Sequence, residues 1–193
     1  MSRDGRLLAI KVQYPGVRAS IDADVDNVAT LLRVSGLLPK ELDIAVLLSE
    51  AKRQLAEEAD YDREGEQMEL FGQLLASDSA LIVPQLDRSF TTANVLAMSF
   101  VEGQPIESLA TAPSATRDAV MTTLIGLVLR ELFEFGVMQT DPNFANYRFQ
   151  PETGRIVLLD FGATRAVPPK TALACRRLLK AGLDHRLDGH ADR

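Results

Sequence analysis

The sequence contains no tryptophan, a single cysteine, Cys175, and only two histidines, His185 and His190. A lone cysteine excludes a disulfide within the chain and a cysteine-rich metal site. Both histidines lie near the C-terminus in a polar tail, so the sequence argues against histidine-based catalysis and gives these two residues no role. We expect Cys175 to be a small buried residue of a C-terminal helix.

Basic residues and long apolar runs are also scarce. The 193 residues include 21 Lys and Arg against 27 Asp and Glu, so the chain lacks the cationic excess that neutralises nucleic-acid phosphates. No stretch approaches ~18 uninterrupted apolar residues, and the start, MSRDGRLLAIKV, has no apolar signal core. With 46% hydrophobic and 25% charged residues, the composition predicts a soluble globular protein that buries roughly 70% of its unfolded surface.

The hydrophobic pattern predicts a mixed α+β fold. Strands are expected over residues 7–13, 80–84, 94–101, 147–149 and 155–160. Amphipathic helices are expected over residues 18–34, 39–76, 114–135 and 170–183. The second of these is too long for one straight element, and Gly136 is expected to cap the third. Because a turn at Asp4-Gly5 precedes the first strand, we expect that strand to be the second arm of a hairpin whose first arm lies before Met1.

The residues most suggestive of chemistry surround one predicted hairpin. Asp141 and Asn146 delimit a D-x-x-x-x-N loop, and a strand, a turn and a second strand then lead to Asp160-Phe161-Gly162. This order is typical of the phosphoryl-transfer centre of protein-kinase-like enzymes. A carboxylate and an amide oxygen suit magnesium, which takes hard oxygen ligands and keeps several waters. Either aspartate alone could be an ordinary turn residue, but the two together favour chemistry.

Lys11 lies within the apolar strand Ala9-Ile10-Lys11-Val12. Such a lysine can be a solvent-facing residue of an edge strand whose charge reaches water. In a kinase-like fold the same position contacts the α- and β-phosphates of the nucleotide and is held by a helix glutamate. The acidic predicted helix offers Glu57, Glu58 and Glu64, and the sequence alone does not choose among them.

Together these segments resemble the ABC1/ADCK/UbiB atypical kinase family, most closely its Coq8-like ubiquinone-biosynthesis branch. The resemblance covers nearly all of residues 4–185. The segments that carry it are KVQYPG at 11–16, SIDAD at 20–24, EEADYDRE at 57–64, VLAMSFVEG at 95–103, MQTDPNFAN at 138–146 and LLDFGATR at 158–165.

The resemblance implies roles in nucleotide binding for two groups of residues. Lys11 is expected to contact the nucleotide phosphates with Glu58 as its helix partner, and Glu64 is the second acidic residue of the same segment. Met98 is expected at the gatekeeper position before the adenine-binding hinge. The backbone groups of the hinge would come from Ser99, Phe100 and Val101.

The resemblance also implies the catalytic and metal-binding residues. Asp141 is expected to be the catalytic-loop aspartate, although Gln139-Thr140 replaces the usual His-Arg. Asn146 and Asp160 are expected to be the magnesium ligands. The implied cofactors are therefore ATP and Mg²⁺.

The implied architecture is a single ABC1-type domain over residues 1–193 with the two-lobed protein-kinase-like fold. Residues 1–101 would form a partial N-lobe with inserted helices, residues 102–193 a short C-lobe, and Gly103-Gln104-Pro105 the hinge. The family's K-x-G-Q helix and alanine-rich nucleotide loop are absent, so we expect the fold to be truncated. No A-P-E segment follows Gly162, so a docking platform for a protein substrate has no support.

The function implied by the resemblance is ATP hydrolysis or an unorthodox small-molecule kinase activity that supports ubiquinone biosynthesis. Implied partners are a membrane surface, isoprenoid or quinone lipid precursors and ubiquinone-biosynthesis proteins. The implied location is the bacterial cytoplasm, peripherally at the inner membrane, or the matrix side of a mitochondrial membrane.

Two alternatives remain open: a nucleotide-responsive, pseudokinase-like scaffold and a non-functional fragment. Basic residues outnumber acidic ones in residues 163–193, an excess that would attract anionic lipid, but a solvated helix face is the more common explanation of such a charge pattern.

Overall fold

A computed structural model describes residues 5–35 and 44–188, which form two compact units. The first unit comprises the chain up to Gln104 together with Asn146–Ala163, and the second comprises Pro105–Ala145 and the chain from Thr164 onward. The first boundary falls within the tripeptide Gly103-Gln104-Pro105, where the hinge was expected. The hairpin that ends at Asp160 groups with the first unit, although sequence order placed it in the C-terminal part. The mixed α+β, protein-kinase-like class is confirmed.

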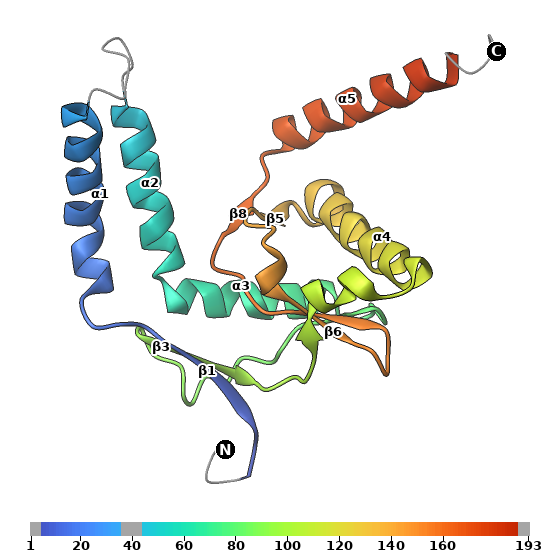
Figure 1. The fold of residues 1–193 in the computed structure, drawn as a ribbon, viewed down its shortest axis with the longest axis horizontal. Helices are drawn as coiled ribbons and strands as arrows, with labels where there is room; N and C mark the ends of the chain where they lie inside the picture. Colours follow the sequence, from blue (N-terminus) through green and yellow to red (C-terminus); the bar gives the residue numbers. More distant parts are fainter. Residues whose placement is uncertain (1–4, 36–43, 189–193) are drawn as a thin grey trace. The chain divides into compact units, whose positions relative to one another are not determined.

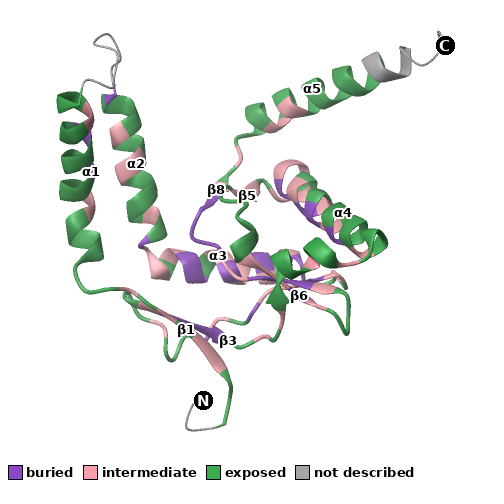
Figure 2. Ribbon diagram, viewed as in Figure 1, coloured by how far each residue is buried: buried purple, intermediate pink, exposed green. Residues whose placement is uncertain are grey.

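The first strand of the first unit pairs within the chain. β1 (Leu8–Val12) lies antiparallel to β3 (Val95–Ser99), with Lys11 opposite Leu96. β3 pairs with one edge of β1, and the expected hairpin arm before Met1 stays a prediction for the other edge. β3 supplies the buried residues of the pair, whereas β1 leaves Ile10 and Val12 exposed (Figure 2).

Three helices connect these strands. α1 (Val17–Val34) and α2 (Ala45–Glu58) lie side by side, and α3 (Tyr61–Leu74) follows at a bend (Figure 1). The predicted long helix is therefore two helices, and its predicted start at Pro39 lies outside the described residues. The break has a local cause, because the side chain of Asp60 accepts a hydrogen bond from the Arg63 N–H at 3.2 Å and so caps α3.

α3 carries most of the helical core of this unit. Glu64, Gly65, Met68 and Phe71 are buried on it, whereas α2 has no buried residue and α1 has only Val25 and Ala29 (Figure 2). This difference places α3, rather than the α1–α2 pair, against the strands that carry the candidate site.

A second sheet completes the unit. Its strand order is β2-β7-β6-β4, with β2 parallel to β7 and β6 antiparallel to β7. The strands are β2 (Leu81–Ile82), β4 (Gln104–Pro105), β6 (Tyr147–Gln150) and β7 (Arg155–Leu158). The β6–β7 hairpin confirms the predicted strand–turn–strand, and its apolar residues Phe149, Ile156, Val157 and Leu158 are buried.

The second unit is mainly helical. Its elements are η1 (Ile106–Thr111), α4 (Ser114–Arg130), the π-helix η2 (Glu131–Phe135), β5 (Val137–Gln139), β8 (Thr164–Ala166) and α5 (Pro169–Asp188). β5 pairs antiparallel with β8, which sets Gln139 opposite Thr164. These two short strands were not predicted, because three residues carry too little periodicity. Gly136 ends η2 at φ 67°, so its predicted cap position is confirmed.

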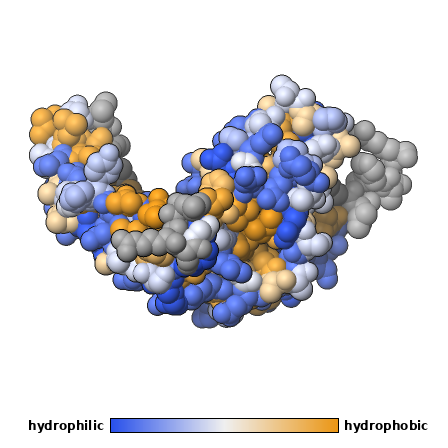
Figure 3. Space-filling view, turned by 90° about the horizontal axis from the view of Figure 1, so that it is seen from below, coloured by the Kyte–Doolittle hydropathy of each residue, from blue (hydrophilic) through white to orange (hydrophobic). Residues whose placement is uncertain are grey.

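The surface retains considerable apolar area, as the orange regions of Figure 3 show. Cys175 is only half-buried, which corrects the expectation of a buried thiol. Within the described ranges, no helix is both long enough and apolar enough to cross a membrane.

Candidate functional site

The core of the candidate site is an ion-pair cluster in the first unit. The Lys11 Nζ lies 2.5 Å from Glu64 Oε1 and 2.9 Å from Asp160 Oδ2. The three residues come from β1, α3 and the end of the β6–β7 hairpin. The Lys11 ammonium thus joins three segments that are distant in sequence. It forms ion pairs with two carboxylates at once.

Burial and charge together shift the pKa values of this cluster. Burial opposes the charge of Lys11, but the Glu64 and Asp160 carboxylates outweigh it and raise the pKa of the ammonium above its usual value. Burial also raises the pKa of the Glu64 carboxyl, and the nearby Asp160 carboxylate adds to this rise while Lys11 counteracts it. Lys11 therefore stays charged at neutral pH.

The partner of Lys11 is Glu64, which corrects the pairing expected with Glu58. Glu58 is the last residue of α2 and is exposed, and its carboxylate accepts a hydrogen bond of 3.5 Å from Gln54 Nε2. The helix break after Glu58 starts a new helical register at Tyr61, and this register turns Glu64 into the interior. Sequence position alone could not fix that rotation.

α3 also holds the Asp-Phe-Gly segment. Arg63 Nη1 donates a 2.7 Å hydrogen bond to the Gly162 carbonyl, and the Phe161 N–H donates to Glu64 Oε1 at 3.4 Å. The ring of Phe71 packs against the ring of Phe161 with centroids 5.4 Å apart. α3 therefore contacts both Lys11 and the Asp-Phe-Gly segment, and Glu64 contacts both of them itself.

Sequence reasoning missed Arg63 and Phe71 as residues of the site. For Phe71 a signal was present in the helical spacing, because Glu64, Met68, Phe71 and Leu75 follow the i, i+4, i+7, i+11 pattern of a buried stripe, whereas Arg63 lies outside this stripe. A charged residue inside such a stripe is a candidate for a functional ion pair.

Asn146 and Asp160 lie at the same end of the β6–β7 ladder. The Leu159 N–H donates to the Asn146 carbonyl at 2.9 Å, which extends the pairing of Tyr147 with Leu158 by one step. Asp160 Oδ1 accepts the Gly162 N–H at 3.0 Å. The amide and carboxylate oxygens are the donors that Mg²⁺ prefers, so these two residues fit the expected metal ligands.

The described residues contain no group of three or more His, Cys, Asp and Glu side chains that could hold a metal by themselves. Magnesium at Asn146 and Asp160 would thus need further oxygens from a nucleotide and from water, as is usual for this ion.

The expected adenine-binding hinge, residues 99–101, begins at the end of β3. Met98 is buried and lies opposite Ala9. The Ser99 N–H donates to the Gln85 carbonyl at 2.8 Å and the Phe100 N–H to the Leu7 carbonyl at 3.0 Å. Backbone carbonyl groups of neighbouring segments therefore accept both of these N–H groups, and Val101 follows the strand in sequence.

Asp141 belongs to the second unit and is exposed. Its N–H donates a 2.8 Å hydrogen bond to the side-chain Oε1 of Gln139, the last residue of β5. Gln139 occupies the position of the histidine in the His-Arg-Asp motif of ordinary kinases. Here its side chain holds the backbone of the Asp141 loop by this hydrogen bond.

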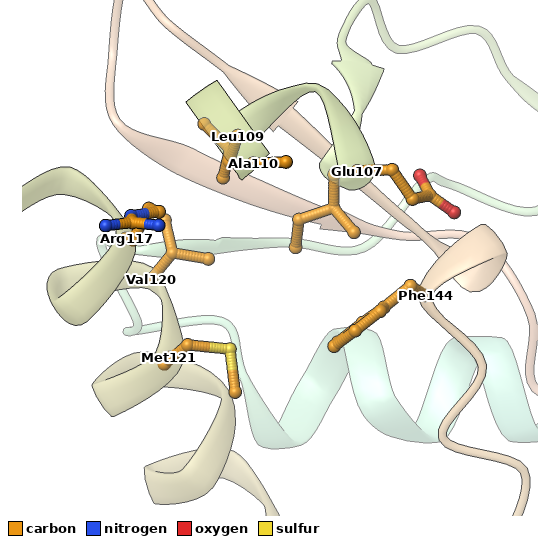
Figure 4. Close-up of a pocket in the computed structure, with 8 residues that line it drawn as sticks. Glu107, Leu109, Ala110, Arg117, Val120, Met121 and Phe144 are labelled. Carbon is orange, nitrogen blue, oxygen red and sulfur yellow. The ribbon is translucent and has the colours of Figure 1, made fainter. Parts of the chain in front are cut away.

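An apolar cavity of about 360 Å³ lies in the second unit (Figure 4), and one of its lining residues, Phe144, follows Asp141 closely in sequence. η1 and α4 form two of its walls, and Phe144 of the Asp141 loop closes another side. Its lining residues are Ile106, Glu107, Leu109, Ala110, Arg117, Val120, Met121 and Phe144. Its volume lies within the range typical of small-molecule sites.

The two-part α+β fold, the lysine–glutamate pair from a strand and a helix, and the Asp-Phe-Gly segment define the protein-kinase-like class. The ABC1 atypical kinase-like domain model matches residues 1–189, and the chain belongs to that family.

Curated relatives agree with this assignment. The chain is 38% identical over 186 residues to the atypical kinase coq-8, mitochondrial, of Caenorhabditis elegans, covering 94% of this chain and 25% of the relative. It is 39% identical over 175 residues to the atypical kinase COQ8, mitochondrial, of Saccharomyces cerevisiae, covering 91% and 35%. For the atypical kinase COQ8B, mitochondrial, of Rattus norvegicus, the identity is 41% over 164 residues, covering 85% and 31%.

A solved structure shows the same fold. The structure titled "The complex structure of Rv3197-erythromycin from Mycobacterium tuberculosis" aligns with a TM-score of 0.66 at 26% identity, covering 87% of this chain and 42% of that chain. The chain thus spans between a quarter and about a third of the length of these curated relatives.

Proposed function

We propose that the chain binds ATP with magnesium and acts as an atypical kinase or ATPase that supports ubiquinone biosynthesis. The observation that carries the proposal is the contact of Lys11 with both Glu64 and Asp160, because it joins the lysine proposed to bind phosphate to the aspartate proposed to bind the metal. Such a juxtaposition is what phosphoryl transfer requires of a protein, since positioning and electrostatics supply most of its catalysis.

Each residue of the site has a distinct part in this proposal. Glu64 would orient the Lys11 ammonium toward phosphate oxygens, and Asn146 and Asp160 would hold the metal. When bound, Mg²⁺–ATP supplies the phosphoryl group to be transferred. Asp141 would accept the proton of an attacking water or small-molecule hydroxyl.

A cavity in the second unit supports a small, partly apolar acceptor as the proposed substrate. The cavity next to Phe144 offers almost only apolar surface, and its neighbour in sequence is the proposed base Asp141. We therefore include isoprenoid or quinone lipid precursors among the proposed partners. A membrane-peripheral location, mitochondrial as in the names of the relatives or at a bacterial inner membrane, belongs to the same proposal.

The test compares nucleotide binding with turnover in the purified chain. We expect Mg²⁺–ATP to raise the melting temperature of the wild type, since a ligand that binds the folded state stabilises it. Phosphate release should fall at least about tenfold in Asp160→Asn and in Lys11→Met. Asp62→Asn, an exposed change on α3, is the matched control and should keep both properties.

The scaffold alternative makes a different prediction. It gains support from Gln139-Thr140, which replaces the His-Arg that ordinary kinases place before the catalytic aspartate. If Mg²⁺–ATP raises the melting temperature but phosphate release is the same in the wild type and Asp160→Asn, the scaffold function replaces the enzymatic one. If neither a thermal shift nor a cooperative melt occurs, both functions are ruled out for this chain.

A further inference from the structure

The second unit buries a carboxyl group that the proposed mechanism does not use. Glu131 is the first residue of the π-helix η2 and is only 2% exposed. A buried carboxyl is costly unless it is hydrogen-bonded, and π-helical turns often occur at functional sites. Among the described elements, η2 packs against α4, β5 and α5. The burial of a carboxyl group at this position therefore suggests a role other than packing.

The hydrogen-bond partners of Glu131 lead toward the Asp141 loop. Its carboxyl accepts a hydrogen bond from the backbone N–H of Gln139. The side chain of the same Gln139 accepts the Asp141 N–H at 2.8 Å. A single residue thus connects the buried carboxyl to the backbone of the proposed catalytic aspartate.

We propose that Glu131 is a positioning residue for the Asp141 loop, acting through Gln139, and that its protonation state sets how firmly the loop is held. The inference rests on the proposed function only for its effect on turnover. Its structural part, the coupling of Glu131 to the Asp141 backbone, stands by itself.

The physical basis is the strength of one hydrogen bond. An ionised carboxylate accepts a backbone N–H in a charge-assisted bond that is stronger than the bond to a protonated carboxyl. Ionising Glu131 should therefore pull Gln139 toward η2, and the change should pass through the Gln139 side chain to Asp141. Burial raises the pKa of Glu131 to about 7, with the Gln139 N–H opposing the rise, so both states are populated near neutral pH.

Charged groups on the surrounding elements do not account for this shift. Burial and the Gln139 hydrogen bond are its only causes. The charged groups on η2 and its neighbours whose side chains the structure describes are Glu134 on η2 itself, Arg117, Asp118 and Arg130 on α4, Arg165 on β8, which pairs with β5, and Lys170, Arg176, Arg177, Lys180 and Asp184 on α5. β5 carries none.

The test follows the amide resonances of Gln139 and Asp141 by ¹H–¹⁵N NMR between pH 5 and 9 in the full chain. Both resonances are expected to titrate with a shared midpoint near 7 in the wild type and to lose that transition in Glu131→Gln. Glu134→Gln changes an exposed carboxylate of the same turn and should preserve it. In the wild type, the Glu131 carboxyl ¹³C resonance reports the titration directly, so the test does not depend on a folded variant.

A carboxyl ¹³C titration without any accompanying change at the Asp141 amide would overturn the inference. So would a transition that persists in Glu131→Gln, because it would then come from a group other than Glu131. If the proposed activity is present, the pH profile of phosphate release should lose its inflection near 7 in Glu131→Gln but keep it in Glu134→Gln. An amide titration without any phosphate release would support the coupling and count against the proposed function alone.

Discussion

Lys11 shows how much one buried contact can decide. Its side chain is 33% exposed, whereas the side chain of its partner Glu64 is 2% exposed. Burying a carboxylate is tolerated only because the ammonium lies 2.5 Å away and the Phe161 N–H adds a second, longer hydrogen bond. The pair therefore links a requirement of folding to a proposed requirement of phosphate binding.

Removing only one partner of this pair should destabilise the chain. In Lys11→Met, Glu64 would lose its cation while still buried, and we expect the free energy of unfolding to fall by about 2 kcal/mol, less than for a fully buried pair because Lys11 reaches solvent. Chemical denaturation at pH 7 measures this loss.

The double variant Lys11→Met/Glu64→Met provides the control. Because it removes both charges and replaces them with apolar groups, it should recover most of the lost stability. The single variant Glu64→Met completes the comparison. If the stability loss of the double variant equals the sum of the losses of the two single variants, the two side chains are not coupled.

Glu131 makes a separate prediction about stability and pH. Its pKa is about 7 in the folded state and near 4.5 in the unfolded chain, so between these values the unfolded chain releases a proton that the folded chain retains. The Glu131 contribution to stability is thus fully present below about pH 4.5 and is lost as pH rises toward 7. The loss amounts to about 3 kcal/mol at most.

Glu131→Gln should remove this pH dependence. The wild-type free energy of unfolding, measured by urea denaturation from pH 5 to 8, should decline relative to that of the variant, which cannot ionise at this position. Parallel curves for the two proteins across this range would contradict the prediction.

At the scale of elements, α3 organises the first unit. One helix supplies Glu64 to Lys11, Arg63 to Gly162 and Phe71 to Phe161. The residue at which α3 begins therefore matters for these contacts, because a shift of the first turn would rotate all three side chains away from their partners. Asp60 sets that start by accepting the Arg63 N–H.

Asp60→Ala should weaken this helix start. Loss of an N-cap costs about 1 kcal/mol, which a thermal or urea melt can resolve. Asp60→Asn retains a side-chain oxygen that can cap the helix, so it should lose clearly less stability. Equal losses in the two variants would instead implicate the charge of Asp60, which also lies 3.5 Å from Arg18.

The same element shows the reach of sequence reasoning. The break of the long helix was expected from its length, and the Asp-Phe-Gly segment from local residues. The choice of Glu64 over Glu58 could not be predicted, because it depends on the rotation of α3 after Asp60. The β5–β8 pair was missed for a related reason: its strands are stabilised by each other, far apart in the chain, and not by their own periodicity.

At the scale of the molecule, the chain forms two compact units with Gly103 next to their boundary. Gly103 is required there by packing. A Cβ at this position would lie 2.8 Å from Arg148 Cβ and 3.3 Å from the Phe149 carbonyl oxygen, closer than side-chain atoms normally approach.

Gly103→Ala should therefore destabilise the chain by about 1–3 kcal/mol, since the strand β6 would have to move. Gly126→Ala is the matched control, because a Cβ at Gly126 would meet nothing within 4 Å and the position is inside α4. That change should stabilise the helix by about 0.5–1 kcal/mol. Calorimetric melts of both variants test the pair, and a neutral Gly103→Ala would show that β6 can adjust.

The sequence by itself determined the family and the local elements of this protein. Short motifs such as LLDFGATR and the periodicity of each helix are encoded within a few neighbouring residues, so a single chain of letters suffices to identify them. The tertiary structure alone decided that Lys11 meets Glu64 and Asp160, and that Glu131 reaches Gln139. These contacts depend on helix rotation, strand pairing and burial, which arise only when distant segments pack together.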